Sequence, residues 1–131
     1  MPAAVESFDL RGYDLVLSSS HAVAKGARVP AGVPHVCYCH TPMRYVWDVS
    51  ADYFQFGPWR RVRQILLALW KERLRAWDRR TSAGVTHFLA SSENVRQRIL
   101  AAYGRAATVL YPPVDTEFFT PARENRGGDY F

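Results

Sequence analysis

Cysteine is scarce in this sequence of 131 residues, which contains only Cys37 and Cys39. Because alternate residues of a strand face the same way, the predicted strand that carries them places both thiols on one side. A disulfide between them would distort the strand, and two thiols are too few for a four-cysteine zinc site. We therefore expect two buried free thiols, no metal site and a reducing environment.

Long apolar runs are also missing from the chain. No segment reaches the ~18 uninterrupted apolar residues that a helix needs to cross a bilayer. Residues 1–9 lack the basic and then apolar order of a secretory signal peptide. We therefore expect a cytoplasmic protein.

Acidic residues are too few to balance the basic ones. The chain has 17 Lys or Arg, 12 Asp or Glu and a formal net charge of +5. Such an excess suggests a phosphate-bearing or polyanionic partner or an anionic membrane surface, without choosing among them. Apolar residues make up 48% of the chain, which is enough for the core of one compact domain.

Short apolar stretches alternate with helical patterns along the chain. Residues 1–12 indicate an irregular lead-in, and residues 21–27 a brief helical turn between the first two strands. Ser91 or Ser92 is expected to cap a helix that ends at Gly104. The predicted strands are residues 13–17, 36–39, 85–90 and 108–111, and the longest predicted helix is residues 59–80. This order predicts an α/β fold with a Rossmann-like, three-layer and mostly parallel sheet.

The loop after the strand at residues 36–39 concentrates polar and aromatic side chains, which are His40, Thr41, Arg44, Tyr45, Trp47 and Asp48. Ligands of open α/β sheets bind at the carboxyl ends of strands, so we interpret this loop as one wall of a substrate site. Structural interpretations stay open beside it. His40 would cap the turn before Pro42, Arg44 would pair with Asp48, and the aromatic rings would belong to the core.

A second candidate wall follows the strand at residues 13–17 and contains Ser18, Ser19, Ser20, His21 and Lys25. Serines that follow a strand are more often turn and cap residues, and we favour that interpretation for them. His35 and His87 lie within predicted strands and are most simply structural.

The predicted helix at residues 59–80 carries eight Lys or Arg against Glu72 and Asp78, so the basicity of the chain is concentrated there. Its apolar residues form one stripe, which we expect to pack on the sheet: Val62, Leu66, Leu69, Trp70 and Trp77. The basic side would contact an anionic membrane through Arg60, Arg61, Arg75 and Arg79. Because one stripe cannot both pack and insert, we expect peripheral electrostatic contact at most. Nucleic acid is disfavoured, since the aromatic residues lie apart from the arginines.

Four segments of the chain resemble the family 4 glycosyltransferases, enzymes of the two-domain GT-B architecture that use nucleotide-sugar donors. They are residues 13–25, residues 39–48 (CHTPMRYVWD), residues 90–99 and residues 109–119 (VLYPPVDTEFF). The resemblance is nearest to bacterial mannosyltransferases of polysaccharide assembly. It implies that residues 1–121 are a partial acceptor-side, Rossmann-like domain, and that residues 122–131 begin an interdomain linker.

The resemblance also implies an activity. A retaining enzyme would move a sugar, expected to be mannose, from a nucleotide-sugar donor to a glycan or lipid-linked acceptor, without a further cofactor. His40 would be catalytic, and the substrate-binding residues would be Thr41, Arg44, Tyr45, Ser20, His21 and Lys25. A second domain would hold the nucleotide, so we expect this fragment to be inactive alone. The alternative is a non-catalytic basic α/β module that binds an anionic membrane or polyanion through residues 59–80.

Overall fold

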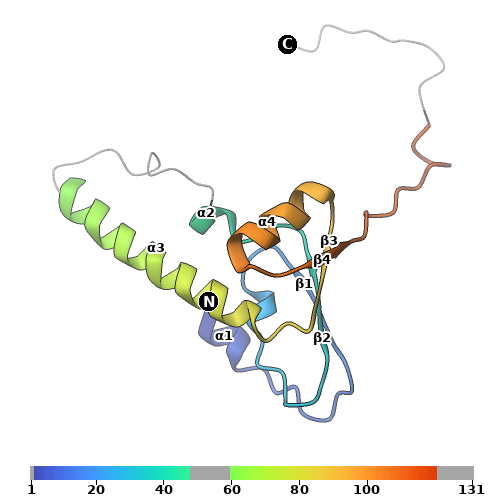
Figure 1. The fold of residues 1–131 in the computed structure, drawn as a ribbon, viewed down its shortest axis with the longest axis horizontal. Coiled ribbons are helices and arrows are strands. Elements are labelled where there is room, and N and C mark those ends of the chain that lie inside the picture. The colour runs from blue at the N-terminus through green and yellow to red at the C-terminus, as the bar shows by residue number, and fades with distance from the viewer. Residues whose placement is uncertain (1, 48–59, 121–131) are drawn as a thin grey trace, which may run out of the picture.

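A computed structural model describes residues 2–47 and 60–120, with the side chains of the long helix described from residue 65 onward. Its centre is a sheet of four parallel strands in chain order (Figure 1). The strands are β1 (Val16–Ser20), β2 (His35–Cys39), β3 (His87–Ala90) and β4 (Ala107–Val109). The predicted α/β, Rossmann-like fold with a parallel sheet is confirmed.

The helical segments of the described residues are α1 (Pro2–Glu6), η1 (Ala24–Gly26), α2 (Arg44–Trp47), α3 (Arg60–Ser82) and α4 (Glu93–Tyr103). The expected irregular lead-in is wrong for residues 2–6, because Pro2 begins a helical turn, a position that suits proline. Residues 7–12 are irregular, as predicted. Tertiary contacts hold this turn in place. Glu6 accepts a hydrogen bond from Trp77 Nε1 at 2.5 Å and pairs with Arg28 at 2.7 Å.

The first strand lies later in the chain than predicted. Ser18, Ser19 and Ser20 are residues of β1 and not the turn residues that we expected to follow it. Ser18 Oγ lies 2.8 Å from His35 Nε2 on the neighbouring strand. Pairing of β1 with β2 therefore outweighs the weak intrinsic preference of serine for strands.

The core lies on one face of the sheet. His35, Cys37 and Cys39 alternate along β2 into this face, and each is at most 1% exposed. α4 covers the same face with Ile99 and its apolar neighbours. Leu17 points to the opposite face and is 71% exposed. The described residues therefore supply the sheet and a helical layer on one side of it, and the prediction of two buried free thiols is confirmed.

Both ends of α4 agree with the sequence signals. The side chain of Ser92 accepts a hydrogen bond from the backbone N–H of Val95 and so caps the first turn. Gly104 ends the helix with a φ of 66°, a left-handed conformation in which a glycine meets no Cβ penalty.

α3 is the longest element of the described residues, and among them its carboxyl-terminal half is the part that packs against the other elements (Figure 1). Its 23 residues span about 34 Å, whereas the five residues of β1 span about 17 Å, so the helix outreaches the sheet. Leu74 and Trp77 pack in a cluster with Met43 and Val46. Leu66, Leu69 and Trp70 are more than half exposed, and the prediction that the whole stripe packs on the sheet is wrong. No helix within the described ranges is long and apolar enough to span a membrane.

Candidate functional site

His40 is the first residue after β2, at the carboxyl edge of the sheet. Its backbone N–H donates to Ser20 O at 2.9 Å, which fixes the residue beside the end of β1. The imidazole is exposed, and its Nε2 lies 2.9 Å from the hydroxyl of Ser19. The edge of the ring meets Tyr38 at a centroid distance of 5.1 Å. An exposed ring with one nitrogen already oriented by a hydroxyl is suited to hydrogen bonding with a polar ligand.

The other candidate residues of the central loop follow His40 in the chain. Arg44 and Tyr45 are exposed on the first turn of α2, where a guanidinium is available for a phosphate and a ring for a sugar. Thr41 Oγ1 is buried and has no hydrogen-bond partner among the described residues. The expected pairing of Arg44 with Asp48 falls outside the described residues, because Asp48 does.

Ser91 and Ser92 bring the amino terminus of α4 to the same edge. Ser91 Oγ donates to the carbonyl of His40 at 3.4 Å. The loop after β2 is therefore bonded to the end of β1 on one side and to the start of α4 on the other. The sequence placed these serines at a helix cap but did not connect them with His40.

The second candidate wall is only partly available to a ligand. His21 is exposed, but Ser20 is buried and its hydroxyl accepts from the backbone N–H of Lys25. Lys25 is 2% exposed, and its ammonium forms an ion pair with Asp78 at 2.5 Å. The expectation that Lys25 binds substrate is therefore corrected, because its charge is neutralised inside the protein.

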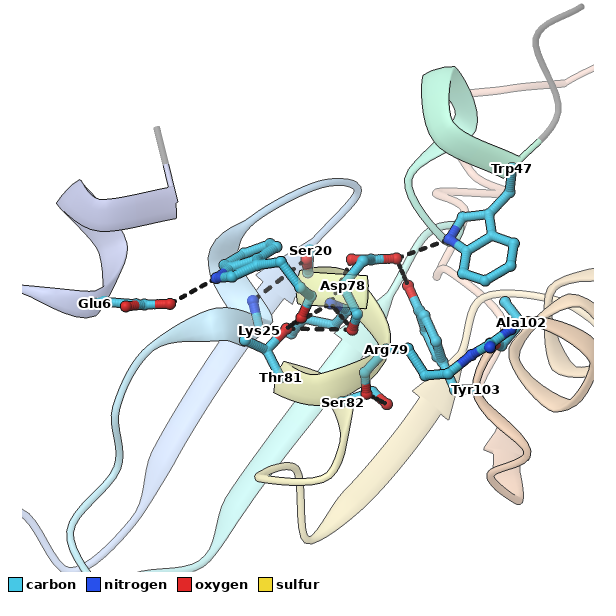
Figure 2. A network of polar contacts seen from close by, with 11 residues as sticks. Glu6, Ser20, Lys25, Trp47, Asp78, Arg79, Thr81, Ser82, Ala102 and Tyr103 are labelled. Carbon is cyan, nitrogen blue, oxygen red and sulfur yellow. Dashed lines mark hydrogen bonds and ion pairs between the residues drawn. The ribbon is translucent and has the colours of Figure 1, made fainter. Parts of the chain in front are cut away.

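Asp78 is the residue that the sequence analysis missed, and it is the centre of a buried network (Figure 2). One carboxylate oxygen accepts from Lys25 Nζ. The other accepts from Trp47 Nε1 and from the hydroxyl of Tyr103, each at 2.8 Å. The network joins the segment after β1, the end of α2, α3 and α4. In the sequence, a sign of this network is that Asp78 adjoins Trp77, a residue of the predicted apolar stripe, on an otherwise basic helix.

Two features of this network define its role. Burial, followed by the negative charge of Asp78, raises the pKa of Tyr103 far above its ordinary value, so the phenol stays a hydrogen-bond donor. Trp47 is held by Asp78 and meets Tyr103 edge-on at 6.2 Å. The structural interpretation of Trp47 is therefore correct, and its ring anchors the far end of the loop that begins at His40.

The thiols of Cys37 and Cys39 have raised pKa values and low reactivity. Burial, followed by the neighbouring thiol of Cys37, raises the pKa of Cys39 to about 12, and burial also raises the pKa of Cys37. Thiols that stay protonated are poor nucleophiles and poor metal ligands. Within residues 2–47 and 60–120, no group of three or more His, Cys, Asp or Glu side chains is placed to hold a metal ion.

His35 is a buried histidine at the start of β2. Its Nε2 is bonded to Ser18, and its Nδ1 has no hydrogen-bond partner in the described part of the chain. Burial, followed by the positive charge of Lys25, lowers the pKa of His35 below its ordinary value. The native state therefore holds this imidazole neutral at a pH where the unfolded chain already binds a proton.

We expect acid to destabilise the fold through His35. The unfolded histidine titrates near pH ~6.5, so stability is retained above that pH and falls as the pH drops toward the lower folded-state pKa. Urea unfolding between about pH 7.5 and pH 5.5 measures this slope. His35→Gln should flatten it, whereas His87→Gln, at an exposed position on β3, should leave it unchanged. Equal slopes in the wild type and His35→Gln would contradict the assignment.

Of the four arginines predicted to contact a membrane, Arg75 and Arg79 make contacts within the domain. The side chains of Arg60 and Arg61 lie outside the described part. Arg75 Nε donates to Val46 O at 2.8 Å and its guanidinium pairs with Glu72, so it braces α2 against α3. Arg79 Nε donates to Ala102 O at 3.2 Å. The guanidinium groups of Arg75 and Arg79 both lie over the ring of Trp47.

Comparison with known proteins gives one positive result. A family model described as Glycosyltransferase Family 4 matches residues 1–118. Searches of curated proteins and of solved structures returned no significant match. The match covers all the strands and the whole loop that carries His40. The chain therefore belongs to glycosyltransferase family 4, and its parallel α/β sheet is that of the amino-terminal domain of a GT-B enzyme.

Proposed function

We propose that this chain is the acceptor-side part of a retaining glycosyltransferase that moves mannose from a nucleotide-sugar donor to a glycan or lipid-linked acceptor. The observation that carries the proposal is the exposed His40 ring at the carboxyl end of β2, oriented by Ser19. Membership of the family supports sugar donors and acceptors in general. The nucleotide would be held mainly by a second domain, and the chemistry would take place at the cytoplasmic side of a membrane.

In the proposed reaction, an acceptor hydroxyl attacks the anomeric carbon of the donor sugar. The nucleotide diphosphate leaves with the electrons of the broken bond and takes up the proton of the acceptor hydroxyl. His40 would hydrogen-bond to the sugar at the reacting centre. Arg44 would offset the negative charge of a donor or acceptor phosphate. Thr41, Tyr45 and His21 would line the acceptor side. Exposed Arg and His side chains suit binding and orientation better than hydrolysis, which uses a pair of carboxylates.

We expect His40→Ala to lower sugar transfer about 10²-fold, the lower end of the range for losing one positioned hydrogen-bond donor at a reacting centre. Ser19→Ala should have a smaller effect, because it removes only the partner that orients the ring. The measurement is the initial rate of labelled sugar transfer in the assembled enzyme, with this chain and a nucleotide-binding domain present. The donors are a panel of nucleotide sugars that includes GDP-mannose.

The matched control is His87→Ala, which removes another exposed histidine at the opposite, amino-terminal end of a strand. Its rate should equal that of the wild type. Full activity of His40→Ala would refute the role of His40, and preference for another donor would refute mannose. Failure of every donor would favour the alternative class, a basic module that only binds a polyanion or membrane.

A further inference from the structure

The amino-terminal half of α3 presents an apolar face that the described residues leave open. Its members are between 56% and 62% exposed, and they are Ile65, Leu66, Leu69 and Trp70. Pairs four residues apart lie one above the other on a helix, so these side chains share one side of α3. We call this set the open face of α3.

The open face continues, toward the amino terminus of α3, the stripe whose other end packs on the domain. Trp77 lies two turns after Trp70 on that stripe and is 8% exposed, and Leu74 packs with Trp77, Met43 and Val46. The sequence suggested a single stripe, for which packing and insertion would exclude each other. In the structure the carboxyl-terminal half of the helix packs on the domain. The apolar side chains of the other half do not pack against the described residues.

The charge around the open face is positive. Arg73 follows Leu69 by one helical turn, Arg80 continues the same side, and both are exposed. The two acidic residues of α3 are already engaged elsewhere. Glu72 pairs with Arg75 at 2.6 Å, and Asp78 is buried with Lys25.

The exposed apolar side chains and the arginines beside them favour one kind of binding partner for the open face. A second copy of the chain would bring two positively charged helices together, which like charges oppose. An anionic bilayer attracts arginine, and its interface accommodates tryptophan at the headgroup level. The stem of an arginine can lie on apolar surface while its guanidinium reaches a phosphate.

We propose that the open face of α3 docks on an anionic membrane, lying in the interface with its apolar side chains at the boundary between headgroups and acyl chains. Arg73 and Arg80 contact the lipid phosphates. This inference goes beyond the proposed sugar transfer, and its test needs no activity.

Vesicle flotation of the full chain tests the proposal. The wild type should bind vesicles that contain phosphatidylglycerol and not vesicles of phosphatidylcholine alone. The double variant Leu66→Glu, Trp70→Glu should bind at least about tenfold more weakly, because it replaces two inserted groups by charges that the membrane repels. Brominated lipid should quench tryptophan fluorescence in the wild type and much less in Trp70→Phe. Binding should weaken at high salt.

The matched control is Leu100→Glu, which makes the same change at a leucine of α4 that is 57% exposed. It should bind like the wild type, and circular dichroism should show all variants folded. Equal binding to both vesicle types, or equal loss in Leu100→Glu and the α3 variant, would overturn the proposal. So would self-association that the α3 variant abolishes without any vesicle binding, since the open face would then be an interface between copies.

Discussion

Asp78→Ala is expected to lower the free energy of unfolding by about 3–5 kcal/mol, the cost of removing one partner of a buried ion pair. Lys25 would keep its ammonium in the interior with only neutral oxygens as acceptors, Asp78 O and Thr81 Oγ1. The indole of Trp47 and the phenol of Tyr103 would lose their acceptor at the same time. Urea unfolding at neutral pH, followed by circular dichroism, measures the change.

The double variant Lys25→Met, Asp78→Asn separates the charge from the packing. It removes both charges, fills the space of the lysine stem and leaves an amide oxygen as acceptor for Trp47 or Tyr103. We expect it to be more stable than Asp78→Ala, because neutral replacements of a buried pair are tolerated far better than half of one. A loss of less than about 1 kcal/mol in Asp78→Ala would contradict the assigned role of the network.

Phe88→Ala is the second large effect, with an expected loss of about 3–5 kcal/mol for a large side chain removed from a packed core. Phe88 is fully buried in the middle of the sheet, where its ring stacks on Tyr103 at a centroid distance of 5.9 Å. The guanidinium of Arg105 lies 5.8 Å from the same ring. The deletion therefore opens a cavity between the sheet and α4 and also loosens Tyr103. Thermal and urea unfolding measure it.

Leu17→Ala is the matched control for Phe88, on the other face of the same sheet. Because Leu17 is 71% exposed, its truncation should change the free energy of unfolding by no more than about 0.5 kcal/mol. A loss as large as that of Phe88→Ala would mean that both faces of the sheet are equally buried, contrary to the structure.

Local signals were sufficient for much of the fold. The helix that begins after Ser92 and ends at Gly104 was predicted, because the residues that cap and terminate a helix lie directly at its two ends in the sequence. The strand at residues 36–39 was predicted from its apolar run and the turn after it. The position of His40 at the end of that strand followed from the same signals, and its exposure agrees with the predicted site.

The errors concern contacts between distant parts of the chain. In the sequence, Lys25 follows a strand and a run of polar residues, as a ligand-binding lysine would. The structure shows that its charge is instead paired with a carboxylate 53 positions away. β1 extends into a run of serines because β2 pairs with it. The packing of α3 could not be predicted from its apolar pattern, because periodicity shows which residues share a side and not how far the partner surface extends.

The wide sequence separation of the Asp78 network also constrains how the chain acquires its structure. Lys25 must remain hydrated during synthesis until residue 78 has emerged, and Tyr103 follows later still. Contacts that close such long loops form late, after local helices and turns. The loop that begins at His40 can be tied to α3 through Trp47 and Asp78 before α4 is complete, but a ribosome-bound chain that stops before residue 103 would lack the contacts of Tyr103 with Trp47 and Asp78.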